Sequence, residues 1–197
     1  GRRVQEGAPY LKGTALVCSF FFFLARENLP MAIVVDKSIP EFEALATGDI
    51  KVSNTSHLGQ MVVLFFYPKD NTPSCTSESL EFREKHKDFA KAGAVVFGVS
   101  RDNMTSHNAF KEKLELPYEL IADTEEKMCH MFGVVKNKIM YGRKVKGIER
   151  STFLIGPDGV LRNEWRGIKV AGHVAEVLKA VKALKKANAA SAESDSE

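Results

Sequence analysis

Residues 61–75 read MVVLFFYPKDNTPSC and join a continuous apolar run to a polar turn that ends in a cysteine. The apolar run, residues 61–67, is typical of a strand buried on both faces of a sheet. Thr72 is a suitable helix N-cap, and Pro73 suits the first helical position, where its missing N–H is not needed. The sequence therefore predicts a buried strand, a turn, and a helix that carries Cys75 in its first turn.

A cysteine in that position is a candidate nucleophile. The first amides of a helix have no intrahelical partner, and the positive end of the helix dipole lies beside them. Both features favour a thiolate over a thiol. A thiolate alone gives a small acceleration, so an enzyme would also need donors oriented toward the transition state. On this local pattern, Cys75 as a small buried residue of an ordinary helix remains the alternative.

The rest of the chain alternates predicted strands with predicted helices. A helix over residues 79–92 leads to an apolar strand at 94–100, which predicts a right-handed βαβ unit. The other predicted elements are a hairpin at 42–52, a helix at 106–114, a strand at 120–122, a helix at 125–132, strands at 151–155 and 160–165, and a last helix with an apolar face. We expect an α/β thioredoxin-like fold, a central mixed sheet flanked by helices.

The two ends differ from the middle. Residues 1–30 hold basic residues and then an apolar run, as in a signal peptide, but the run is too short to span a bilayer comfortably. We expect an atypical extension, from a mis-assigned start or an added segment, with an export signal as the alternative. The globular domain is expected over residues 31–184, and residues 185–197 are expected to be a disordered tail.

Composition excludes several classes of protein. The formal charge of +3 and the lack of a basic block with interleaved aromatics argue against nucleic acid, and we also expect no membrane partner. Three cysteines without a CxxC pair favour a reducing cytoplasm over a secreted disulfide framework, and no zinc spacing is present. The histidines are expected to be surface or cap residues, and they are His57, His86, His107, His130 and His173.

The residues around Cys75 are similar to a known signature, P-x-x-x-[TS]-x-x-C, in which Pro68, Thr72 and Cys75 stand in register. Together with further motifs the chain resembles the peroxiredoxins, specifically the bacterioferritin comigratory protein or peroxiredoxin Q branch. The further motifs are FYPK at 66–69, GVSRD at 98–102, FGV at 132–134 and GIERSTFLI at 147–155. The resemblance covers about residues 33–184.

The resemblance implies a role for each matched residue. Cys75 would be the peroxidatic nucleophile, oxidised to a sulfenic acid. Thr72 would hydrogen-bond the peroxide and the sulfur, and Pro68 would shield the sulfur from bulk water. Arg150 would place a permanent cation beside the thiolate, although alone it reads as a surface charge. The backbone amides of Ser74 and Cys75 would complete the substrate pocket.

Some positions depart from the family or stay open. Glu78 either orients an arginine or is a solvated carboxylate near a helix start. Ser74 stands where the family usually has glycine, and Leu80 stands where many members carry a second, resolving cysteine. Cys129 is expected to be a buried core residue rather than a resolving cysteine, and Cys18 lies in the atypical extension. We therefore expect a one-cysteine cycle.

The implied function is a thiol-dependent peroxidase that reduces hydrogen peroxide and organic hydroperoxides without metal, haem or flavin. The external reductant would be thioredoxin, glutaredoxin or glutathione, and the protein would be a cytoplasmic monomer. The alternative is a non-enzymatic thioredoxin-fold redox sensor or holdase. The missing CxxC argues against a disulfide reductase.

Overall fold

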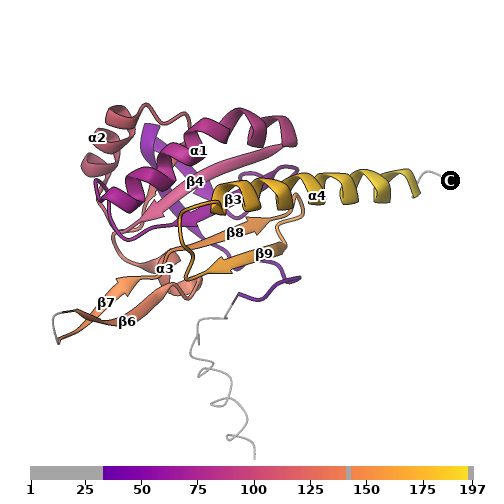
Figure 1. The fold of residues 1–197 in the computed structure, drawn as a ribbon. Helices are drawn as coiled ribbons and strands as arrows, with labels where there is room; N and C mark the ends of the chain where they lie inside the picture. Colours follow the sequence, from indigo (N-terminus) through magenta and orange to yellow (C-terminus); the bar gives the residue numbers. More distant parts are fainter. Residues whose placement is uncertain (1–32, 141–142, 195–197) are drawn as a thin grey trace, which may run out of the picture.

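A computed structural model describes residues 33–140 and 143–194, which are built around a seven-stranded mixed sheet (Figure 1). The strand order is β2-β1-β5-β4-β3-β8-β9. The strands are β1 (Glu43–Ala46), β2 (Ile50–Ser53), β3 (Met61–Phe66), β4 (Ala94–Ser100), β5 (Glu119–Ala122), β8 (Ser151–Ile155) and β9 (Leu161–Arg166). Strands β3, β4 and β5 are parallel, and the other pairs are antiparallel. The predicted α/β fold with a mixed sheet is confirmed.

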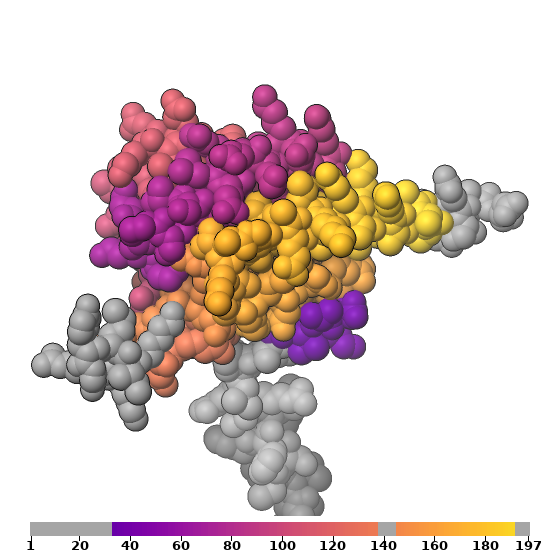
Figure 2. Space-filling view, viewed as in Figure 1, coloured from indigo at the N-terminus to yellow at the C-terminus, as the bar shows by residue number. Residues whose placement is uncertain are grey.

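The helices cover both faces of this sheet. They are α1 (Pro73–Ala92), α2 (Met104–Leu114), α3 (Lys127–Met131) and α4 (His173–Ser194). Side chains of α1, α2 and α4 pack with Val63 and Phe65 of β3 in one hydrophobic cluster, while α3 packs with Leu64 and Phe66 in a second. Because neighbouring residues of a strand point to opposite faces, the two clusters lie on opposite sides of the sheet. Figure 2 shows α4 in yellow lying along α1 in magenta.

The close packing of β4 on its neighbours depends on Gly98. A Cβ atom at this position would lie 2.7 Å from Cδ2 of Leu120 and 2.8 Å from Cζ of Phe65. It would also lie 3.1 Å from Cε1 of Tyr67, the residue that follows β3. Glycine therefore lets two aromatic rings of the β3 segment pack directly against the β4 backbone.

A second sheet that the sequence did not predict precedes Arg150. It is a two-stranded hairpin, β6 (Val135–Met140) and β7 (Arg143–Ile148), which projects from the main body (Figure 1). The amide of Glu149 donates to the carbonyl of Val134 at 2.8 Å. This bond closes the base of the hairpin and fixes where the chain enters β8.

Two predicted elements differ from the structure. Helix α3 is shorter than expected, because Glu126 takes a left-handed backbone with a φ of 58° and the carboxylate of Asp123 caps the helix at the amides of Met128 and Cys129. Residues 185–194, expected to be disordered, continue α4 as far as Ser194. That segment is rich in alanine, which has the highest helix propensity. The expected extension at 1–30, with Cys18, lies outside the described residues.

Two general findings concern only the residues that the structure describes. None of their helices is both long enough and apolar enough to cross a membrane. They also contain no group of three or more His, Cys, Asp and Glu side chains placed to hold a metal ion.

Candidate active site

Helix α1 begins where the sequence predicts. Thr72 is the N-cap with an extended backbone, Pro73 opens the helix, and the amide of Thr76 makes an intrahelical bond to the carbonyl of Thr72 at 2.9 Å. The amides of Ser74 and Cys75 lie before Thr76, whose amide makes the first bond to a carbonyl of the helix, so these two amides have no partner within the helix. Only 1% of Cys75 is exposed, so its sulfur lies in the core at the positive end of α1.

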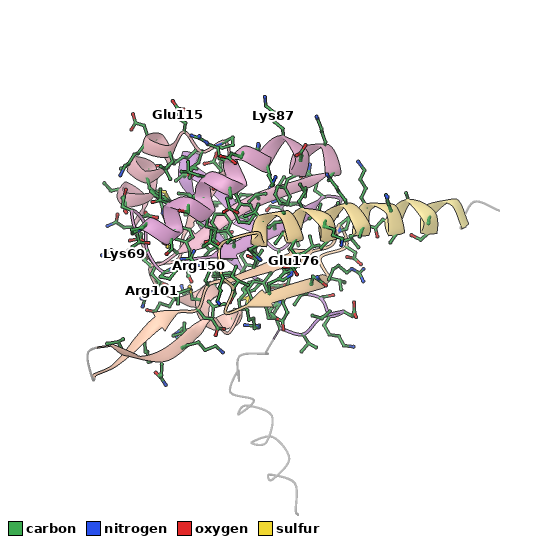
Figure 3. The ribbon with its side chains drawn as sticks, viewed as in Figure 1. Lys69, Lys87, Arg101, Glu115, Arg150 and Glu176 are labelled. Atoms are coloured by element: carbon green, nitrogen blue, oxygen red, sulfur yellow. The ribbon has the colours of Figure 1, made fainter. Side chains whose placement is uncertain are left out.

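Arg150, at the start of β8, reaches the sulfur of Cys75. Its Nη2 donates to Sγ at 3.1 Å and to the hydroxyl of Ser74 at 3.1 Å. Figure 3 shows Arg150 on the same side of the molecule as Lys69, in the loop that leads into α1. The structure thus brings Arg150 and Cys75 together, and the serine that replaces the usual glycine contacts the cation directly.

Glu78 holds the other side of the guanidinium. Its Oε2 accepts from Nη1 of Arg150, and the carboxylate is completely buried. Among the described residues no hydrogen-bond partner is found for its Oε1. Burial raises the pKa of Glu78 to about 7, although the charge of Arg150 acts to lower it. The alternative of a solvated carboxylate near the helix start is therefore wrong, because Glu78 is buried and forms an ion pair with Arg150.

The charge of Arg150 is secured by its two acidic neighbours. Burial acts to lower the pKa of Arg150, but Glu78 and Cys75 together raise it above its ordinary value. The side chain is 11% exposed, so solvent screens these interactions little. The positively charged guanidinium of Arg150 thus lies beside the sulfur of Cys75 in a largely buried site.

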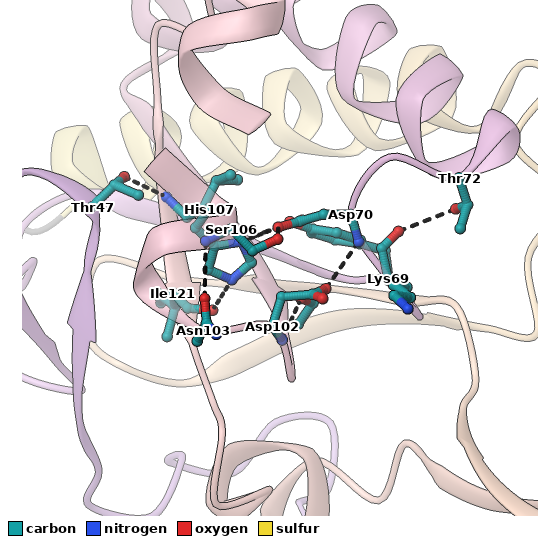
Figure 4. A network of polar contacts seen from close by, with 12 residues as sticks. Thr47, Lys69, Asp70, Thr72, Asp102, Asn103, Ser106, His107 and Ile121 are labelled. Carbon is teal, nitrogen blue, oxygen red and sulfur yellow. Dashed lines mark hydrogen bonds and ion pairs between the residues drawn. The ribbon is translucent and has the colours of Figure 1, made fainter. Parts of the chain in front are cut away.

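Pro68 and Thr72 lie in the loop before α1, and both are half-buried. The hydroxyl of Thr72 donates to the carbonyl of Lys69 at 3.1 Å (Figure 4). This bond leaves the oxygen of the hydroxyl free to accept a second bond. The predicted contact of Thr72 with peroxide, and the shielding role of Pro68, remain predictions.

Cys129 lies in the second cluster, on the other side of the sheet from Cys75. Both are free thiols. Burial, with a further contribution from Asp123, raises the pKa of the Cys129 thiol. Leu80, at the position of the missing second cysteine, is partly buried against the cluster that holds Cys75.

The sequence missed a polar cluster around Asp70. His107 and His173, expected to be surface or cap residues, are 0% and 4% exposed. His107 contacts Asp70, and Nε2 of His173 lies 2.8 Å from the hydroxyl of Thr152. Burial lowers the pKa of His173 to about 4. The one feature of the sequence that could have indicated this cluster is Asp70 itself, an acidic residue in the loop between β3 and α1.

A thioredoxin-like sheet that holds a buried cysteine in the first turn of a helix, against an arginine, defines a thiol-based redox protein. The model of the AhpC/TSA family matches residues 35–164. The chain therefore belongs to the AhpC/TSA family, and within it to the peroxiredoxins of the Bcp and Q type.

Individual relatives agree with this assignment. Peroxiredoxin Bcp of Xanthomonas campestris pv. campestris is 47% identical over 137 residues, which cover 70% of this chain and 86% of that protein. Peroxiredoxin Bcp of Bacillus subtilis is 44% identical over 152 residues, covering 77% and 97%. A solved mutant of Xylella fastidiosa PrxQ has a TM-score of 0.73 at 39% identity, covering 77% of this chain and 96% of that chain.

Proposed function

We propose that this protein reduces hydrogen peroxide and organic hydroperoxides at Cys75, in a one-cysteine cycle completed by an external thiol. The observation that carries the proposal is the 3.1 Å contact between Nη2 of Arg150 and the buried Sγ of Cys75. A positive charge at that distance stabilises the thiolate and, during reaction, the negative charge that moves to the peroxide oxygens.

The proposed chemistry has two stages. The thiolate of Cys75 attacks one peroxide oxygen, the O–O bond breaks, and the leaving alkoxide or hydroxide takes a proton, giving a sulfenic acid and an alcohol or water. One reductant thiol then forms a mixed disulfide with Cys75 and releases water. A second reductant thiol breaks that disulfide, which restores Cys75 and leaves the reductant oxidised.

The surrounding residues have distinct proposed roles. Arg150 holds the developing charge, and Glu78 orients its guanidinium through the buried ion pair. The amides of Ser74 and Cys75 and the hydroxyl of Thr72 would bind the peroxide oxygens, while Pro68 limits access of water to the sulfur. Support for organic substrates comes from a structural neighbour, Xanthomonas campestris bacterioferritin comigratory protein, which is described for its alkyl peroxide reduction activity.

A one-cysteine cycle is supported by the position of Cys129. The sheet separates it from Cys75, and burial disfavours its thiolate, so it is poorly placed to resolve a sulfenic acid at Cys75. Residue 80 is leucine and offers no thiol. The reductant would therefore be thioredoxin, glutaredoxin or glutathione, and we propose that the protein acts as a cytoplasmic monomer.

The deciding experiment is rapid-mixing peroxide consumption with single-turnover monitoring of the thiol. Cys75→Ser should abolish consumption, and the matched variant Cys129→Ser should keep most of it. Oxidation no faster than that of free cysteine would refute the peroxidase and favour the redox sensor. A Cys75–Cys129 disulfide in mass spectra of the oxidised protein would refute the one-cysteine cycle. Coupled assays with each of the three reductants identify the external thiol.

A further inference from the structure

The loop before α1 is tied to α2 by a buried polar cluster (Figure 4). At its centre is Asp70, which is 4% exposed. Its Oδ1 accepts from the hydroxyl of Tyr67 at 2.7 Å, and its Oδ2 accepts from the hydroxyl of Ser106 at 2.7 Å and from Nδ1 of His107 at 2.9 Å. We name Tyr67, Asp70, Ser106 and His107 the loop anchor.

His107 faces acceptors on both sides of its ring. Nδ1 meets the carboxylate of Asp70, and Nε2 lies 3.1 Å from the carbonyl oxygen of Ile121 in β5. Both ring nitrogens therefore have a polar partner, and the ring bridges the loop at Asp70 to strand β5. Asp70 and His107 thus form a buried polar pair with side chains 2% and 0% exposed. Burial acts to raise the pKa of Asp70, but hydrogen bonds and charge from His107, with Ser106 and Tyr67, bring it below its ordinary value.

The same loop is fixed through its backbone and its neighbours. The amide of Asp70 donates to Oδ2 of Asp102 at 2.9 Å, and the hydroxyl of Ser100 donates to that oxygen at 2.7 Å. Asn71 has a left-handed backbone with a φ of 58°, and its side chain accepts from Nζ of Lys113 at 3.0 Å. A non-glycine residue in this conformation persists only when its surroundings hold it there.

We propose that the loop anchor positions Cys75 for reaction with peroxide, with Asp70 and His107 as positioning residues that act through residues 70–75. This inference rests on the proposed peroxidase function. Asp70 lies only five residues before Cys75, and the loop that it holds leads directly into the first turn of α1, where Thr72 is the N-cap. A displacement of about 1 Å at a reacting centre can lower a rate by roughly 100-fold. The loop anchor therefore sets the alignment of the sulfur with the donors around it.

The alternative explanation is that the loop anchor only stabilises α2 and has no effect on the reactivity of Cys75. A control variant must therefore destabilise α2 without changing a side chain that contacts Asp70. Asn103 offers this control, because its side chain caps α2 by accepting from the amide of Ser106 at 2.9 Å. Asn103→Ala should lower the melting temperature and leave the loop contacts in place. Tyr67→Phe removes one hydrogen bond to Asp70 and keeps the ring in the core, so it should fold even if Asp70→Asn or His107→Gln does not.

The readout is the ratio of two single-turnover rate constants of Cys75, one with hydrogen peroxide and one with iodoacetamide. Alkylation needs only an accessible thiolate, whereas peroxide reduction also needs aligned donors. The ratio should fall at least tenfold in Asp70→Asn and His107→Gln and about threefold in Tyr67→Phe. It should stay within twofold of wild type in Asn103→Ala.

Two results would overturn this role. The first is a ratio that stays at the wild-type value in both single variants, Tyr67→Phe and Asp70→Asn. If Asp70→Asn does not fold, a wild-type ratio in Tyr67→Phe is sufficient. The second is an equal fall of the ratio in Asn103→Ala. A wild-type protein that reacts with peroxide no faster than free cysteine would instead refute the proposed function, and the positioning role with it.

Discussion

Replacing Arg150 by methionine tests the buried ion pair that Arg150 and Glu78 form beside the sulfur of Cys75. Glu78 is fully buried, its Oε1 has no hydrogen-bond partner among the described residues, and Arg150 holds its Oε2. Arg150→Met would leave a buried carboxylate with neither oxygen paired to the guanidinium. Removing one partner of a buried ion pair costs about 3–5 kcal/mol, a large part of the roughly 5–15 kcal/mol that holds a domain folded. We expect the variant to lose stability as well as activity.

The size of this loss should depend on pH. The pKa of Glu78 is about 7 with Arg150 present, and loss of the cation raises it further, so the carboxyl can escape the penalty by taking a proton. The destabilisation by Arg150→Met should therefore be larger at pH 8 than at pH 5.5. Urea unfolding at the two pH values measures it directly.

The second variant, Glu78→Gln in the Arg150→Met background, removes the stranded charge. It should recover at least about half of the lost stability at pH 8 and still react slowly with peroxide, because the cation beside Cys75 is gone. Wild-type stability of Arg150→Met at pH 8 would refute the reasoning. So would a double variant that is no more stable than the single one.

Three further predictions concern stability. The pKa of Glu78 is about 7 in the folded protein and 4.5 in its ordinary state, so the native state binds more protons between these values. The contribution of Glu78 to the unfolding free energy is therefore complete below pH 4.5 and is lost as pH rises through 7. Over this range the unfolding free energy of wild type should fall by roughly 3 kcal/mol at most relative to that of Glu78→Gln. A difference between the two proteins that stays constant with pH in urea unfolding would contradict this. Asp123→Ala removes the cap of α3 and should lower the unfolding free energy by about 1–2 kcal/mol in urea. An unchanged unfolding free energy would show that the cap does not stabilise the protein. Gly98→Ala puts a methyl group 2.7 Å from Leu120 and should cost about 1–3 kcal/mol, and an unchanged melting temperature would show that the core has room.

The strand and helix around Cys75 could be predicted because their signals are local. An apolar run, an N-cap and a proline at the first helical position all fall within residues 61–75, and the structure forms β3 and α1 there. The mixed sheet followed from the alternation of such segments. The same reasoning failed after Leu184, because a polar composition was read as disorder while its alanines favour helix.

Contacts between distant residues could not be predicted in the same way. Glu78 and Arg150 are 72 residues apart, and Asp70 and His107 are 37 apart. Only the fold brings each pair together, and burial then gives the charges their importance. A single histidine in a predicted helix carries no sign of the carboxylate it will meet, so the sequence does not predict the burial of His107 against Asp70.

Helix α1 is continuous from Pro73 past Leu80, so the residue at position 80 decides whether a disulfide to Cys75 could strain this helix. In a continuous helix, Cα atoms five residues apart are separated by roughly 8–9 Å, beyond the ~7 Å that a disulfide tolerates without backbone movement. A cysteine at position 80 could therefore reach Cys75 only if the helix unwound. With Leu80 at this position and packed against the core, no disulfide to residue 80 can require α1 to unwind.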